Sequence, residues 1–397
     1  MNHITNKLGQ ASVLVAGILA TGTMTVPNTV QADMFATDKF SLYGDFRFRL
    51  ESDWDSHKAD GVTTRDDRNR ARIRARVGFN YNHNEYFSYG ARLRSGSDNN
   101  HLSPHITVLD FDGNDTGSAQ FNFDKWFLEM RNNEGVNFKK GDNGAWGWIG
   151  RNSLPYWKQN EMFWDDDATP TGLAMGYKTK LGASQLAMNA GYFSLPAGMQ
   201  KFAGNLGLGQ AVLSTKLGAN KLTAAGGLLA FEANPDGDSD ATHSSLWDGN
   251  GGRDYQIWIL SLQGKFKAGG LPLTLGLDMM HNNKGYSDTD PDPFTVANRD
   301  ETDGYVLSAK LGQLKKPNDW LLGYYYAHIE TFAVNSSYAQ DDWGRWNPQS
   351  SNMKGHELRG AYQAMKNLNV VARFYSIEDI TDDQDGKRFR LDFNYKF

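Results

Sequence analysis

The sequence predicts an all-β protein, a transmembrane antiparallel β-barrel of about sixteen strands with short periplasmic turns and long extracellular loops. The last eleven residues, 387–397, alternate apolar and polar side chains and end on an aromatic, Phe397. A period of two gives a strand one oily and one wet face, which in a membrane barrel meet lipid and lumen. The last strand of a soluble sandwich could show the same alternation.

The remaining strands are identified by the same two-residue period. In residues 39–50, Phe46 and Phe48 fall on one face while Arg47 and Arg49 fall on the other. A charge on the lipid face would cost about 2–4 kcal/mol at mid-membrane, so the charged faces are expected to line the lumen. The expected strands are residues 39–50, 68–82, 85–95, 121–131, 136–151, 172–181, 184–193, 209–217, 222–231, 254–267, 271–280, 303–314, 319–331, 355–365, 368–377 and 387–397.

The gaps between these segments alternate between short and long. The short gaps are residues 83–84, 132–135, 182–183, 218–221, 268–270, 315–318 and 366–367. The long gaps are 51–67, 96–120, 152–171, 194–208, 232–253, 281–302, 332–354 and 378–386. A barrel with tight turns on one side and long loops on the other predicts this rhythm, whereas a sandwich has no reason to keep it. The even strand number places both termini on the periplasmic side.

The N-terminus predicts export. Residues 1–32 combine Lys7, an apolar and small-residue stretch at 11–21, and Val30-Gln31-Ala32, which resembles a cleavage site. This pattern is typical of a secretory signal peptide. Residues 33–397 then form a single barrel domain, expected in the outer membrane of a Gram-negative cell. The chain has no cysteine, so it has no disulfides and no thiol chemistry. Its net charge of −5 argues against general nucleic-acid binding.

Arginine occupies every second position between residues 68 and 76. The five guanidinium groups must therefore share one face of a strand, about 6.5–7 Å apart. The strands expected beside this one add six more arginines to the same wall. The candidate pore-lining residues are Arg47, Arg49, Arg68, Arg70, Arg72, Arg74, Arg76, Arg92, Arg94, Arg388 and Arg390.

Two interpretations of this arginine wall stay open. Arginine remains charged and presents a planar fork of donors, so a stripe of it can steer anions or carboxylates through a pore. Alternatively, the arginines pair with acids of the lumen, and opposed walls create a transverse field in a general pore. The available acids are Asp45, Glu51, Glu129 and Glu357 on strands, with Asp165, Asp166 and Asp167 on a loop.

Loop 152–171 combines aromatic, basic and acidic residues over a length that would suit a segment folded into the lumen as a constriction. The alternative is an ordinary surface loop. The candidate constriction residues are Arg151, Trp157, Lys158, Glu161, Asp165, Asp166 and Asp167.

Metal and catalytic sites have weaker signals. Aspartates alternate in residues 236–240 and 288–292, and carboxylates at such spacing can bind Ca²⁺. Neither run has the glycine and terminal glutamate of a helix-loop-helix site, so solvated loop acids are favoured and no cofactor is expected. No nucleophile-elbow, zinc-protease or phosphate-loop motif is present, so no catalytic residue is predicted.

Several short motifs, in order along the chain, resemble the putative porin family of Gram-negative outer membranes. They are residues 70–76 (Arg-Ala-Arg-Ile-Arg-Ala-Arg), 123–127 (Phe-Asp-Lys-Trp-Phe), 150–151 with 155–157, 164–167 with 170–173, and 315–320 with 323–326. The resemblance covers most of the mature chain. It implies a β-barrel that passes solutes, but it supplies no ligand. Asp166, a third acid between Asp165 and Asp167, makes the candidate constriction loop more acidic.

These observations predict a porin, a passive channel for small hydrophilic solutes whose arginine-rich wall could favour anionic or carboxylate solutes, and not an enzyme. The alternatives are a surface adhesin or receptor built on the same barrel and, less favoured, an outer-membrane hydrolase. The expected partners are outer-membrane lipid and lipopolysaccharide, the solutes, the barrel-assembly machinery through the C-terminal strand, and further copies of the chain in a homotrimer. Nucleic acid is not expected.

Overall fold

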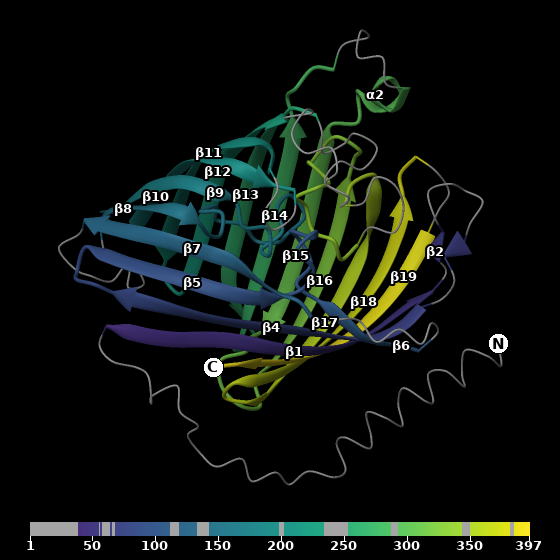
Figure 1. Cartoon of the computed structure of the whole chain (residues 1–397), viewed down its shortest axis with the longest axis horizontal. Helices are drawn as coiled ribbons and strands as arrows, with labels where there is room; N and C mark the ends of the chain where they lie inside the picture. The colour runs from purple at the N-terminus through teal and green to yellow at the C-terminus, as the bar shows by residue number, and fades with distance from the viewer. Residues whose placement is uncertain are drawn as a thin grey trace.

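The chain forms a closed antiparallel barrel in which β1 pairs with both β4 and the last strand, β19 (Figure 1). The computed structural model describes residues 39–54, 56–57, 64–65, 68–111, 119–132, 143–197, 202–233, 253–286, 293–343, 350–381 and 385–397. The short helix α2 (Pro293–Asn298) lies beyond the long-loop end of the strands (Figure 1). No helix in the described part of the chain is long and apolar enough to cross a membrane. The predicted signal peptide lies outside the described residues.

Sixteen positions of the barrel are filled in the described ranges, because β5 and β6 share one position beside β4. The predicted fold class is confirmed. The strands are β1 (Phe40–Trp54), β4 (Arg68–Asn82), β5 (Phe87–Ser95), β6 (Ile106–Asp110), β7 (Phe121–Asn132), β8 (Gly144–Arg151), β9 (Thr171–Leu181), β10 (Ser184–Pro196), β11 (Phe202–Leu217), β12 (Asn220–Ala233), β13 (Tyr255–Ala268), β14 (Leu271–Asn282), β15 (Asp303–Gly312), β16 (Trp320–Ile329), β17 (Met353–Met365), β18 (Leu368–Asp379) and β19 (Asp385–Lys396). The two-residue strands β2 (Ser56–His57) and β3 (Thr64–Arg65) form a separate sheet.

Two of the expected ranges need correction, and a third lies partly outside the described residues. β11 begins at Phe202, inside the expected loop 194–208, because glycines alternate with Leu206 and Leu208 and conceal the usual pattern of a wet inner face. The expected loop 96–120 contains the additional strand β6. The strand expected at 136–151 is described only as β8, since residues 133–142 lie outside the described residues.

The two faces of the strands separate as the alternation predicts. On β19, Phe389 and Tyr395 are exposed on the outer surface, whereas Arg388, Arg390 and Asp392 are buried on the inner face. Large exposed apolar side chains recur around the outside of the barrel, as a lipid-facing surface requires.

The inside of the barrel also holds a hydrophobic cluster, which the sequence analysis did not predict. Loop 152–171 and a second loop, described at residues 330–343 and 350–352, bury apolar side chains against the inner faces of β11 to β14. Those inner faces are therefore apolar where a water-filled lumen would require polar residues, because apolar surface is stabilised by contact with other apolar surface. The largest contributors are Phe163, Trp164, Phe231, Tyr255, Phe332, Tyr338 and Trp343.

Candidate functional site

The arginine wall consists of the inner faces of β1, β4 and β19, and its order follows from strand register. On β4, Arg70 lies opposite Glu51 and Arg76 lies opposite Asp45. Arg76 Nη2 is 2.7 Å from the Asp45 carboxylate. The inner face of β1 carries acids towards its two ends, and each of these acids faces an arginine on β4. Between them, Arg47 and Arg49 face Arg74 and Arg72. The wall therefore contains a lattice of cross-strand ion pairs. Some of its acids, such as Asp45 and Glu51, each contact more than one arginine.

Glu51 is the most strongly enclosed acid of this lattice. Its carboxylate is fully buried and contacts Arg70 and Arg390, the latter at 2.5 Å from Nε. Arg388 and Arg72 follow at 3.9 and 4.0 Å. Removing one partner from a buried ion pair leaves an uncompensated charge, at a cost of roughly 3–5 kcal/mol. This carboxylate therefore holds three strands of the wall in register.

Other predicted arginines of the inner face have partners on an adjacent strand or in the segment that follows their own strand. Arg49 donates from Nε to Asp392 at 2.6 Å on β19. Arg92 on β5 donates from Nε to Asp124 on β7 at 3.0 Å. Arg94 is fully buried, and its guanidinium donates to backbone carbonyls of the segment that follows β5. Of the acids proposed as partners of the wall, Glu129 instead pairs with Arg131 at 2.8 Å.

Loop 152–171 crosses the inside of the barrel. Trp157 donates its backbone N–H to Gln210 of β11 at 2.8 Å, and Asn160 donates from Nδ2 to Asp278 of β14 at 2.6 Å. At the other end of the loop, Asp167 lies 2.6 Å from Nη1 of Arg76 on β4. The loop thereby connects strands on opposite sides of the barrel. The predicted residue Arg151, at the end of β8, also holds the loop, because its Nε donates to the Thr169 carbonyl at 2.9 Å.

The three consecutive acids of this loop have different environments. Burial would raise the pKa of Asp167, but Arg76 and Arg74 outweigh it and lower the value to about 2. Asp166 is mostly exposed and pairs with Lys158 at 2.6 Å. Burial raises the pKa of Asp165 well above its ordinary value, and neighbouring carboxyls add to the effect. A run that looks uniform in sequence therefore contains a half-buried carboxylate held by arginines, a solvated carboxylate and a buried acid whose pKa is raised.

Sequence reasoning missed that the second loop folds inward at its described residues, 330–343 and 350–352, because it expected residues 332–354 to form a loop on the outside. The rings of Tyr338 and Trp164 stack with centroids 5.5 Å apart, and Gln340 donates its N–H to the Glu161 carbonyl at 3.0 Å. Asp342 then pairs with Arg390 of the wall and with Arg373 of β18. A signal was present: residues 332–339 are apolar or uncharged, unlike the acid-rich loops around them.

A polar cavity of about 430 Å³ lies between the two inner loops and β15 to β18. Arg359 sits 4.7 Å above the ring of Tyr325 and pairs with Glu357 at 2.6 Å. Lys310 lies 5.3 Å from the same ring. None of the eleven wall arginines lines this cavity. Its charged lining is Lys158, Glu161, Asp166, Lys310, Asp342, Glu357, Arg359 and Arg373. The sequence analysis named four of these residues and missed Lys310, Asp342, Arg359 and Arg373.

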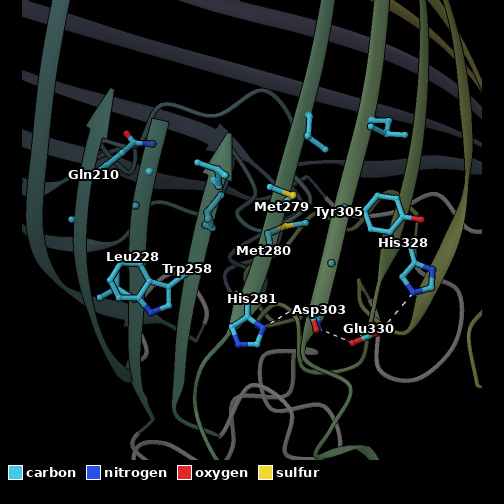
Figure 2. Close-up of a pocket in the computed structure, with 18 of the residues that line it drawn as sticks. Gln210, Leu228, Trp258, Met279, Met280, His281, Asp303, Tyr305, His328 and Glu330 are labelled. Atoms are coloured by element: carbon cyan, nitrogen blue, oxygen red, sulfur yellow. Dashed lines mark hydrogen bonds and ion pairs between the residues drawn. The ribbon is translucent and has the colours of Figure 1, made fainter. Parts of the chain in front are cut away.

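A larger groove, of about 1090 Å³, lies on the outer surface across β11 to β16 (Figure 2). Its apolar lining includes the exposed ring of Trp258. Figure 2 shows a polar rim where His281 contacts Asp303 at 2.8 Å and His328 approaches Glu330 at 3.9 Å. The groove faces away from the lumen, so we do not place it on a solute path.

No metal centre is found in the described part of the chain, where no three histidine or acidic groups come together in a way that could hold an ion. The aspartate runs at 236–240 and 288–292 lie outside the described residues. The suggestion of loop Ca²⁺ therefore stays a prediction.

Comparison with known proteins agrees with this geometry. Residues 55–208 match the model of a family described as putative porin. Four of the five motif groups named above fall in this range, and the group at 315–326 lies outside it. No curated protein matches the chain.

Among solved structures, OprB of Pseudomonas putida at high pH superimposes with a TM-score of 0.56 at 12% identity, over 91% of this chain and 94% of that one. OmpF of Salmonella typhi in complex with daunomycin gives 0.49 at 14% identity, over 90% and 97%. Identities this low show only a shared fold. The chain therefore has the fold of the bacterial porins, and the resemblance to the putative porin family is confirmed over residues 55–208.

Proposed function

We propose that this protein is an outer-membrane porin through which small hydrophilic solutes diffuse passively along the cavity beside β15 to β18. The observation that carries the proposal is the cavity itself, a polar space inside a closed barrel with four basic and four acidic side chains on its wall. The fold and the family match support a channel rather than an enzyme.

The proposal gives the arginine wall two roles. Most of its guanidinium groups are neutralised by acids of the same three strands and of the inner loops, so they hold the loops in place. The predicted preference for anionic or carboxylate solutes would then come from the charges that remain unbalanced, and we expect it to be modest. Export by the signal peptide, contact with lipid and lipopolysaccharide, assembly through β19 and trimerisation belong to the same proposal.

The decisive experiment is single-channel conductance of the purified, folded chain in a planar bilayer. Discrete conductance steps are expected. Replacing Lys310 by Trp adds bulk to the cavity wall and should lower the step size. Replacing Lys366 by Trp, on an exposed short turn, provides the matched control and should leave it unchanged. Equal conductance in all three proteins would place the solute path elsewhere.

One observation favours a receptor or adhesin as the second candidate. The two inner loops fill part of the lumen with a hydrophobic cluster, as a plug would. Folded protein that inserts into bilayers but conducts no ions, either alone or after the loops are loosened by Trp164→Ala, would support this alternative.

A further inference from the structure

The charges of the arginine wall do not balance at its middle. At the short-turn end, Arg74 and Arg76 share the carboxylates of Asp45 and Asp167. Arg49, in the next row, pairs with Asp392 at 2.6 Å. At the long-loop end, a group of four arginines surrounds three acids. These residues are Arg68, Arg70, Arg388 and Arg390 with Glu51, Asp53 and Asp342. The two remaining arginines, Arg47 and Arg72, lie between these ends.

Arg47 makes no ion pair with a carboxylate within 4.0 Å in the part of the chain that the structure describes. Its Nε donates to the Asn394 amide oxygen at 2.6 Å, and its Nη1 lies 3.5 Å from Nε2 of His105. The Asn394 amide and the His105 ring carry no compensating charge, and Asp392 acts on Arg47 only from beyond ion-pair distance.

Arg72 is almost as poorly compensated. Its Nη2 donates to the Ser103 hydroxyl at 3.2 Å and to the His105 carbonyl at 3.4 Å. The closest acid, Glu51, is 4.0 Å away and already engaged by closer arginines. The Nε of Arg72 is buried and finds no hydrogen-bond partner among the described residues. A buried guanidinium nitrogen without an acceptor is costly, so an acceptor is expected there.

The two arginines are near neighbours in the wall, and both contact His105. Register places Arg47 opposite Arg74 and Arg49 opposite Arg72, so Arg47 and Arg72 are diagonal neighbours on adjacent strands. Diagonal neighbours lie roughly 7–8 Å apart at the backbone, within reach of long side chains. Burial and the surrounding arginines lower the pKa of His105 well below its ordinary value, so its ring stays neutral there. Asp341 acts on Arg72 only at longer range.

We propose that Arg47, Arg72 and the Ser103 hydroxyl form a lumen site for a small oxyanion, either free phosphate or the carboxylate of a solute. Two guanidinium forks and a hydroxyl suit an anion with several acceptor oxygens better than a halide. Arg72 retains 11% of its side-chain exposure, so water and ions of the lumen can reach it. A role for this site in binding solutes as they pass through the channel rests on the proposed function. The binding of an anion by these residues does not depend on that function.

Two readouts on the full-length folded chain test the site. In the first, single-channel conductance in KCl is titrated with inorganic phosphate or with succinate at constant ionic strength. Both oxyanions should reduce the conductance at millimolar concentration. Arg72→Gln should raise the half-effect concentration about tenfold, the loss expected for one charge-assisted hydrogen bond. Arg131→Gln removes an ion-paired arginine elsewhere on the inner face and should change nothing. An effect of phosphate alone identifies free phosphate as the ligand, and an effect of succinate alone identifies the carboxylate of a solute.

The second readout does not need conduction. Phosphate should raise the melting temperature of the wild-type barrel in detergent relative to chloride, and Arg47→Gln should abolish the increase. If Arg72→Gln does not fold, Arg72→Lys keeps the charge, loses the fork and should weaken binding. Stabilisation by phosphate without any conductance would refute the porin proposal and leave the site intact. Conductance with no oxyanion effect in either readout, or with equal effects in wild type and Arg72→Gln, would overturn the site.

Discussion

Replacing Asp167 by Asn should change the charge of the lumen without moving the loop that carries it. The Asp167 carboxylate lies 2.6 Å from Arg76 and 3.8 Å from Arg74, and its side chain is 14% exposed. Removing one member of a buried pair costs about 3–5 kcal/mol. Because Asp45 still contacts both arginines and some water reaches the site, we expect a loss at or below the lower limit of this range, about 2–3 kcal/mol.

The apolar contacts of the loop outweigh that loss. Phe163 and Trp164 are at most 1% exposed, and full burial of one such side chain contributes roughly 1.5–3 kcal/mol. The two together therefore hold the loop with about 3–6 kcal/mol, which exceeds the ion-pair contribution. In Asp167→Asn the loop should stay in place, and the reversal potential in a KCl gradient should shift toward anions because one negative charge is lost.

Equilibrium unfolding of the detergent-solubilised barrel measures the loss of stability in Asp167→Asn. The reversal potential in a planar bilayer measures the change in ion preference. Asp166→Asn is the matched control, since Asp166 is 68% exposed and its pair with Lys158 is screened by water. Its unfolding free energy should differ from that of the wild type by less than about 1 kcal/mol. Equal losses in the two variants, or new protease cleavage within loop 152–171 of Asp167→Asn, would refute the reasoning.

Three further predictions concern pH, packing and backbone. Burial raises the pKa of Glu161 to about 8, so raising the pH through that value should ionise it and shift the reversal potential toward cations, and Glu161→Gln should remove the shift. Because the folded protein holds this proton where the unfolded chain has lost it, the barrel should also lose stability as pH rises from about 4.5 to about 8. Trp164→Ala should cost about 3–5 kcal/mol and expose the loop to protease. Gly150→Ala places a Cβ 2.3 Å from a backbone oxygen at positive φ and should cost at least about 1–3 kcal/mol by unfolding, whereas Gly226→Ala, with open space around it, should not.

The number of strands and the direction of their faces could be predicted from the sequence, because both depend on neighbouring residues. Alternation along 387–397 assigned Arg388 and Arg390 to the inner face, and the structure buries them there. The same reasoning failed at 202–209, where the inner face is apolar because a loop from elsewhere covers it. The alternation of residues along a strand indicates only the polarity of each face. It does not indicate which other part of the chain that face will contact.

The ion-pair partners of the arginine wall could be identified only from the tertiary structure. Arg76 meets Asp167 across 91 residues of sequence, and Lys310, Arg359 and Arg373 meet the inner loops only because those loops fold inward. The sequence by itself determined a barrel with a basic inner wall. Tertiary structure decided which arginines are neutralised, because that depends on strand register and on two loops whose apolar side chains find complementary surfaces far along the chain. For the same reason, no acid of the two loops lies within 4 Å of Arg47 or Arg72 among the residues that the structure describes.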